Sequence, residues 1–182
     1  MKMDDQRGRS VPRTSRATTP LGIDGDGFIV ASELTDSSVG DASVGGTMID
    51  QMEAAVARFT ADGAYDTRAI YQALAARGAP GLKIVIPPKR TAAVDPRATG
   101  SWRQRNAAIE RIAEVGRRQW RKEAGAHQQA RAENGMFRYK RIIGDSLRAR
   151  KVEAQNREAM IGVNTINRMT ALGMPLSEAV TA

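Results

Sequence analysis

The sequence predicts an α/β protein: a mixed sheet with flanking helices, followed by a basic helical C-terminal half. Between Leu21 and Pro88, short apolar runs typical of strands alternate with stretches of helical periodicity. After Pro88, lysine and arginine recur among apolar residues at helical spacing. Hydrophobic residues make up 41% of the 182 residues and aromatic ones only 4%, so we expect a single domain with an aliphatic core.

Residues 1–20 differ in composition from the rest of the chain, because they are rich in arginine, serine, threonine and proline. Such a segment buries too little apolar surface to offset the chain entropy lost on folding, so we expect it to be disordered. A basic arm that touches nucleic acid is one interpretation. A leader unrelated to the rest of the chain is the interpretation we favour, which leaves residues 21–182 for the folded domain.

The stretch LGIDGDGFIVASEL, beginning at Leu21, predicts two short strands joined by an Asp-Gly turn. The acidic turn also invites comparison with a calcium loop. Phe28 and Thr35 exclude this, because they stand where such a loop needs oxygen side-chain ligands and a glutamate. Residues 41–56 then predict a helix with methionine and aliphatic side chains on one face.

The next predicted unit is strand, helix, strand. A short strand ends at Asp62, residues 67–77 form a helix closed by Gly78, and LKIVIPP is an apolar strand stopped by its two prolines. Parallel strands need such a helical crossover, so we expect the sheet to be partly parallel.

Three helices are predicted in the basic half, at residues 104–123, 129–143 and 151–172. Trp102 and Trp120 stand among the arginines of the first. They could stack on DNA bases, but burial against the sheet or along the helix is the interpretation we favour.

The charge balance favours a polyanionic partner. Lysine and arginine number 28 against 20 acidic residues, giving a net charge of +8, and such an excess attracts nucleic acid. A solvated basic surface without a partner is the alternative. There is no cysteine, which excludes disulfides and thiolate sites. No apolar run is long enough for a membrane span, and there is no signal peptide, so we expect no membrane association and a cytoplasmic protein.

Asp62 is the first candidate site residue, since a carboxylate at a strand end before a tight turn often binds metal. The alternative is a simple turn residue. Metal-dependent phosphoryl transfer needs several converging carboxylates, and Glu133 is the best second ligand in the helical half. Lys140, seven residues later, lies on nearly the same helix face and would hold a DNA backbone. On spacing alone, a solvated Glu/Lys face is favoured.

Several stretches in order carry a family resemblance: GFIVASELTDSSVGDAS, ADGAYDTRAIYQAL, IVIPPKR, RNAAIERIAEVGRRQWRKEAGAH, AENGMFRYKRIIGDSLRAR and NRMTALGMP. From about residue 21 to residue 174 the chain resembles the C-terminal part of an insertion-sequence transposase of the DDE superfamily. The resemblance implies an incomplete ribonuclease H-like fold and three acidic ligands for Mg²⁺ or Mn²⁺. It also implies DNA as partner, namely the ends of the element and its target, with a homo-oligomer or an intact transposase as protein partner.

The resemblance assigns Asp62 as the family's second aspartate, in the ADGAYD motif. Glu133 and Lys140 occupy the last two positions of the helical signature Tyr-x₂-Arg-x₃-Glu-x₆-Lys. Ala126 and Gln129 replace its tyrosine and arginine, which weakens phosphate handling.

The family's first aspartate has no counterpart in residues 1–20. Asp4 and Asp5 lie in a polar segment, and Asp24 matches a position that the family does not use for metal. We therefore expect a truncated or frameshifted catalytic domain that is inactive alone, because it supplies two of three metal ligands. The alternative is a non-catalytic DNA-binding or regulatory protein that pairs with intact transposase.

Charge and resemblance together predict five arginines that contact DNA phosphates, an interaction that salt weakens. They are Arg103, Arg105, Arg117, Arg118 and Arg121. In the ADGAYD turn, we expect Tyr65 to pack beneath the site and Asp66 to cap the following helix.

Overall fold

The computed structural model describes residues 19–35, 41–126 and 129–173, so most of the predicted leader lies outside the described residues. The strands are β1 (Leu21–Ile23), β2 (Ile29–Ser32), β3 (Val56–Thr60) and β4 (Gly78–Val85). The helices are α1 (Asp41–Asp50), the 3₁₀ turn η1 (Gly63–Tyr65), α2 (Arg68–Arg77), α3 (Trp102–Ala124), α4 (Gln129–Ile142) and α5 (Val152–Ala171). The predicted mixed α/β class is confirmed.

The strands form two separate pairs. β1 and β2 are antiparallel, β3 and β4 are parallel, and no pairing joins the two within the described residues. The prediction of one mixed sheet is therefore wrong, because the described residues form two separate two-stranded sheets. Local signals, a hairpin turn and a helical crossover, specify each pair. No local signal specifies contact between the pairs.

The β1–β2 hairpin is closed by its Asp-Gly turn, as predicted. Asp24 Oδ1 accepts hydrogen bonds from the backbone N–H groups of Asp26 and Phe28, both at 2.9 Å. Gly27 adopts a φ of +90°, which only glycine takes at no steric cost. The aspartate thus organises the turn rather than a calcium site.

The β3–α2–β4 unit also follows the prediction, with one correction. The cap of α2 is Thr67, whose Oγ1 accepts from the Ile70 N–H at 3.4 Å. The predicted cap, Asp66, is instead a buried residue. Gly78 ends α2 with an extended backbone, because the chain continues directly into β4.

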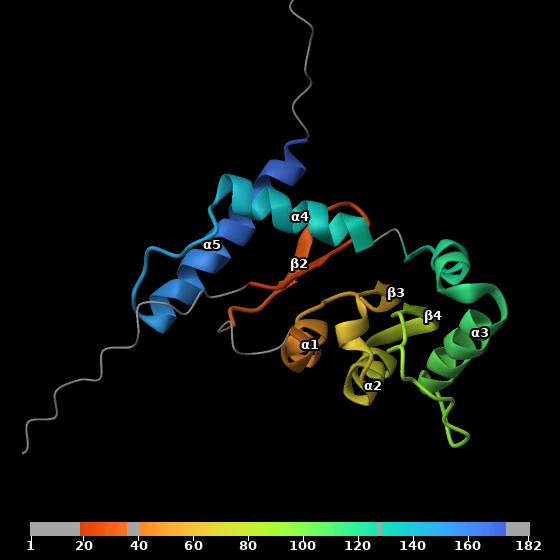
Figure 1. Cartoon of the computed structure of the whole chain (residues 1–182). Helices are drawn as coiled ribbons and strands as arrows, with labels where there is room; N and C mark the ends of the chain where they lie inside the picture. Colours follow the sequence, from red (N-terminus) through yellow and green to blue (C-terminus); the bar gives the residue numbers. More distant parts are fainter. Residues whose placement is uncertain (1–18, 36–40, 127–128, 174–182) are drawn as a thin grey trace, which may run out of the picture.

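Two hydrophobic clusters hold the elements together. One joins α1, α2 and β4 around Ile49, Leu74 and Ile86. The other packs α4 and α5 on the β1–β2 hairpin, through Tyr139 and Ile166. Figure 1 shows α4 and α5 beside the hairpin, with the β3–β4 pair and its helices as a second group.

The long helix α3 contains a kink that the sequence analysis missed. Gly116 has a φ of +80° and a ψ of 155° inside the helix, so two helical segments meet there. Trp120, after the kink, is only 6% exposed, which confirms burial for this tryptophan. No helix among residues 19–35, 41–126 and 129–173 combines the length and apolar character that a membrane span requires.

Side-chain amides cover the outer edges of both strand pairs. On β2, Asn167 of α5 accepts from the Ile29 N–H at 2.8 Å and donates to the Ile29 carbonyl at 2.9 Å. On β4, Gln104 of α3 accepts from the Ile84 N–H at 2.9 Å and donates to the Leu82 carbonyl at 2.8 Å. Each amide thus takes the place of a neighbouring strand.

We expect Asn167→Ala and Gln104→Ala each to lower the free energy of unfolding by about 1–3 kcal/mol, because backbone groups lose their partners. Urea unfolding measures this effect. The matched controls are Asn164→Ala on α5 and Gln119→Ala on α3, both exposed, for which we expect about 0.5 kcal/mol or less. Equal losses at the test and control positions would contradict the role of the amides.

Candidate functional site

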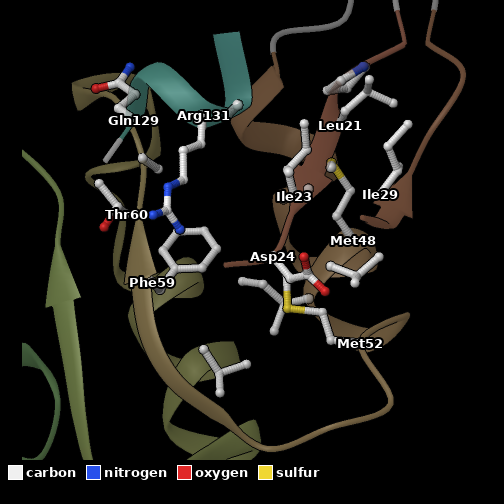
Figure 2. A pocket seen from close by; sticks show the side chains of 18 of the residues that line it. Leu21, Ile23, Asp24, Ile29, Met48, Met52, Phe59, Thr60, Gln129 and Arg131 are labelled. Carbon is white, nitrogen blue, oxygen red and sulfur yellow. The ribbon is translucent and has the colours of Figure 1, made fainter. Parts of the chain in front are cut away.

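A pocket of about 1230 Å³ lies between the two strand pairs. Figure 2 shows Leu21, Ile23 and Met52 on one side of it and Phe59 on the other. Helix α4 closes it with residues along most of its length, from Gln129 to Lys140. The pocket therefore lies where elements from both halves of the sequence meet, namely β1, β2, α1, β3, η1 and α4.

Asp62 lies in this pocket at the end of β3, where it also caps η1. Its Oδ1 accepts from the Ala64 N–H at 2.8 Å, and its side chain is otherwise exposed. Oδ2 has no hydrogen-bond partner among the described residues. Asp62 can therefore be both a turn residue and a metal ligand. One carboxylate oxygen shapes the turn, and the other stays available to a ligand.

Glu133 and Lys140 reach the same pocket from α4, and both are exposed. Gly135 between them lets α4 lie close on β1, since an added Cβ would overlap Ile23 Cδ1. The close approach of this helix brings the two predicted residues to the pocket that Asp62 lines.

The pocket also has basic residues that hold the surrounding elements. Arg58 on β3 donates through Nη2 to the carbonyl oxygens of Ala124 and Gly125, at 2.5 and 3.2 Å, at the end of α3. Arg131 on α4 donates to the Gly25 carbonyl of the hairpin turn at 2.6 Å. Lys140 makes no such bond to another described residue, so its ammonium group is available to a ligand.

The donor chemistry of Asp62 and Glu133 fits a divalent cation of the Mg²⁺ type. Such ions take oxygen ligands and are bound through one or two carboxylates with several waters retained. Within the described parts of the chain, no three acidic, histidine or cysteine side chains gather as a metal-binding group. The fold therefore brings the two candidate ligands to one pocket, and Asp24 and Glu53, which also line it, form no group of three with them.

The five predicted DNA-contact arginines lie on α3, away from the pocket. Arg103, Arg118 and Arg121 are exposed. Arg117 donates to the Pro88 carbonyl at 2.8 Å. Arg105 has a different role, because its Nε lies 2.7 Å from Asp66 Oδ1 and the two side chains are only 11% and 0% exposed. The charge of Arg105 is thus used inside the protein, which favours a structural role for this residue over the predicted phosphate contact.

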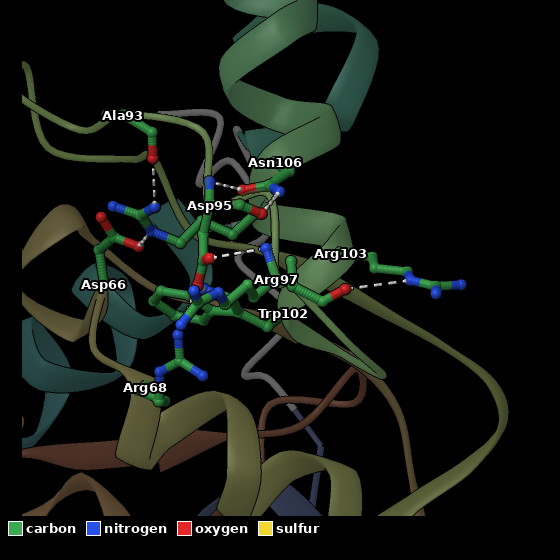
Figure 3. Close-up of polar contacts among 10 residues, drawn as sticks. Asp66, Arg68, Ala93, Asp95, Arg97, Trp102, Arg103 and Asn106 are labelled. Atoms are coloured by element: carbon green, nitrogen blue, oxygen red, sulfur yellow. Dashed lines mark hydrogen bonds and ion pairs between the residues drawn. The ribbon is translucent and has the colours of Figure 1, made fainter.

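Asp66 and Arg105 belong to a polar network at the start of α3 (Figure 3). Asp66 Oδ2 also accepts from the Lys89 N–H at 3.0 Å, and Arg105 donates to the Ala93 carbonyl at 3.2 Å. The network fixes the loop between β4 and α3 onto the ADGAYD turn. Tyr65 of that turn packs against the core and lines the pocket, as predicted.

Asp95 is a second centre of this network that the sequence analysis missed. Its Oδ2 accepts from Arg68 at 2.6 Å and from Trp102 Nε1 at 3.1 Å. The Arg97 N–H, with smaller effects of Arg68 and Trp102, holds the pKa of the Asp95 carboxyl below its usual range. The Asp95-Pro96 dipeptide, in the loop before α3, is a sequence signal for such a turn.

Trp102 is half-buried within the same network. Its ring meets Tyr71 edge-on at 4.9 Å, and the guanidinium groups of Arg68 and Arg105 lie 4.9 and 4.6 Å from its centroid. These partners within the protein favour the packing interpretation over stacking on DNA bases.

Comparison with known proteins supports the family resemblance. Residues 20–167 match the family described as transposase DDE domain. No solved structure gives a significant match. The match covers the hairpin, the ADGAYD turn, and the α4 residues that line the pocket. The chain belongs to the transposase DDE domain family.

Proposed function

We propose that this chain supplies metal-binding and DNA-binding groups for transposition, with Asp62 and Glu133 as ligands of Mg²⁺ or Mn²⁺. Lys140 contacts the DNA backbone in this proposal. Its main support is that these three residues, from the turn after β3 and from α4, line one pocket. Membership of the transposase family makes DNA phosphodiesters the natural substrate class.

The chemistry of the pocket residues suits this role. Divalent ions held by carboxylates stabilise the attacking and leaving oxygens during an in-line displacement at phosphorus. Asp62 offers a free carboxylate oxygen on a fixed turn, and Glu133 offers a second carboxylate from a helix packed on β1. The ammonium group of Lys140 neutralises a phosphate beside them.

The proposal includes an incomplete ribonuclease H-like fold, in which the two strand pairs flank the site. Two carboxylates hold fewer ions than three, so the isolated chain does not cleave DNA. Cleavage of element-end DNA by the purified chain with Mg²⁺ would overturn this part.

Metal binding provides the direct test of the two ligands. We expect Asp62→Asn and Glu133→Gln each to weaken Mn²⁺ binding by about tenfold or more, a change of about 1.4 kcal/mol, because each removes an anionic oxygen donor. Mn²⁺ titration followed by electron paramagnetic resonance gives the affinity.

Glu110→Gln on α3 is the matched control, since Glu110 is exposed and does not line the pocket. Circular dichroism checks that every variant folds. If Mn²⁺ binds both pocket variants as tightly as the wild type, the metal site is wrong, and a non-catalytic DNA-binding or regulatory role becomes the better interpretation.

DNA binding tests the role of Lys140. We expect Lys140→Met to weaken binding to duplex DNA and to reduce the slope of log affinity against log salt by about one, because one phosphate contact is lost. Fluorescence anisotropy over a series of salt concentrations measures both quantities. Lys83→Met on β4 is the matched control, as Lys83 is exposed outside the pocket. An unchanged salt slope for Lys140→Met would contradict the assignment.

A further inference from the structure

We propose that Lys89 and Arg90, which follow β4, form a second contact with DNA phosphates, beside the ADGAYD turn. This contact is separate from the pocket, because neither residue lines it. The inference deepens the proposed function and rests on its DNA binding. It does not depend on the metal ligands or on Lys140.

The basic pair lies beside the turn that begins at Asp62. β3 and β4 are parallel and end side by side, with Thr60 opposite Val85 (Figure 1). Asp62 follows the first strand, and the Pro-Pro-Lys-Arg segment, residues 87–90, follows the second. The two segments touch, since a Cβ added at Gly63 would lie 3.1 Å from the carbonyl oxygen of the first proline. A phosphate held by the basic pair therefore lies at the edge of the sheet that leads into Asp62.

The backbone around the basic pair is fixed by hydrogen bonds. Arg117 of α3 donates to the carbonyl of the second proline at 2.8 Å, and Asp66 Oδ2 accepts from the Lys89 N–H at 3.0 Å. The Ala92 N–H then donates to the Lys89 carbonyl at 3.0 Å, which closes a turn around Arg90. Groups that are held in place before binding lose less entropy when a ligand arrives.

A buried ion pair holds this segment. Asp66 accepts from the Lys89 N–H and is itself paired with Arg105, and the side chains of the pair are 0% and 11% exposed. Such a pair often adds no more stability than apolar side chains of similar volume, and its best-supported role is to specify one arrangement. Here that arrangement is the position of the basic pair on the ADGAYD turn.

The side chains of the basic pair are available to a ligand. Lys89 and Arg90 are exposed. Neither forms an ion pair or a side-chain hydrogen bond with another residue that the structure describes, Asp62 included. In this they differ from Arg105 and Arg117, whose guanidinium groups bind partners within the protein.

The neighbouring sequence leaves the positive charge of the pair uncompensated. From residue 67 to residue 109 the one acidic residue is Asp95, whose carboxylate already binds Arg68. Arg97 and Arg103 in the same stretch are exposed. A positive surface of this kind attracts polyanions, and arginine and lysine contact phosphate without reading sequence. The phosphate backbone of DNA is therefore the ligand that fits, in keeping with the family.

The salt dependence of duplex DNA binding by the full chain tests the proposal. We expect Lys89→Met and Arg90→Met each to weaken binding and to reduce the slope of log affinity against log salt by about one, and the double variant by about two. Lys89→Arg should keep the wild-type slope, because it keeps the charge. Lys83→Met, exposed on β4, is the matched control and should change neither quantity. Fluorescence anisotropy measures both, and circular dichroism checks that every variant folds.

Cross-linking tests the place of contact directly, because the chain has no cysteine of its own. Arg90→Cys that carries a photoreactive group on its thiol should form a covalent adduct with duplex DNA. Lys83→Cys that carries the same group should form much less adduct. Added salt should lower the yield at position 90 together with the binding affinity.

A wild-type salt slope for the double variant would overturn the proposal, as would equal cross-linking from positions 83 and 90. Failure of the pocket assignment gives a different result. In that case Lys140→Met keeps the wild-type slope and the pocket variants keep their Mn²⁺ affinity, while the double variant at Lys89 and Arg90 still lowers the slope. Absence of any DNA binding by the wild-type chain would overturn this contact together with the DNA-binding part of the proposed function.

Discussion

Replacing Asp66 with alanine is expected to lower the free energy of unfolding by about 3–5 kcal/mol. The change removes both carboxylate oxygens that hold Arg105 Nε at 2.7 Å and the Lys89 N–H at 3.0 Å. Arg105 is only 11% exposed and would keep its charge without a partner. Urea unfolding of the purified variant measures the loss.

Removing both charges should be less harmful than removing one. We expect Asp66→Leu combined with Arg105→Met to be more stable than Asp66→Leu alone, because no unpaired charge stays buried. The control is the exposed side chain of Arg111 on α3, which forms ion pairs with Glu114 and Glu123. There, Glu123→Ala should lower the free energy of unfolding by less than about 1 kcal/mol. A loss below about 1 kcal/mol for Asp66→Ala would show that this pair does not hold the loop.

Replacing Trp102 with alanine is expected to cost about 3 kcal/mol, the lower end of the range for tryptophan in a core, because the ring is half-buried. The variant loses the edge-on contact with Tyr71 at 4.9 Å and the bond from Nε1 to Asp95 at 3.1 Å. It also removes the ring that the guanidinium groups of Arg68 and Arg105 contact. Thermal and urea unfolding measure the loss.

Trp102→Phe separates the contribution of ring packing from that of the hydrogen bond to Asp95, since phenylalanine keeps an aromatic ring and lacks the N–H donor. We expect it to recover more than half of the stability that Trp102→Ala loses. DNA affinity, measured at a temperature where both variants are folded, should not change. A marked loss of DNA affinity at full stability would instead support stacking of Trp102 on bases.

The sequence by itself determined the local elements. The Asp-Gly turn formed the hairpin because Asp24 Oδ1 accepts from the backbone N–H groups of Asp26 and Phe28 and because Gly27 takes a positive φ. Apolar periodicity placed α2, α4 and α5 within two residues of their observed ends. The ordered motifs around Asp62 and Glu133 identified the family that the comparison later matched. These signals depend on residues that are neighbours in the chain.

Only the tertiary structure decided the different roles of residues that are of the same type and close together in the sequence. Arg103 and Arg105 look alike in the sequence, yet one is exposed and the other forms a buried ion pair. Nothing nearby in the sequence marks Gln104 and Asn167 as covers of strand edges, because their partners lie on β4 and β2.

Tertiary packing also decided that Asp62 and Glu133 line the same pocket. α4 lies against β1 because Gly135 leaves room for Ile23, and this contact brings Glu133 to the pocket at the end of β3. Periodicity gives the face of a helix but not the element that the face packs against. Contacts between distant segments depend on the shape and burial of both partners, which exist only once the chain has folded.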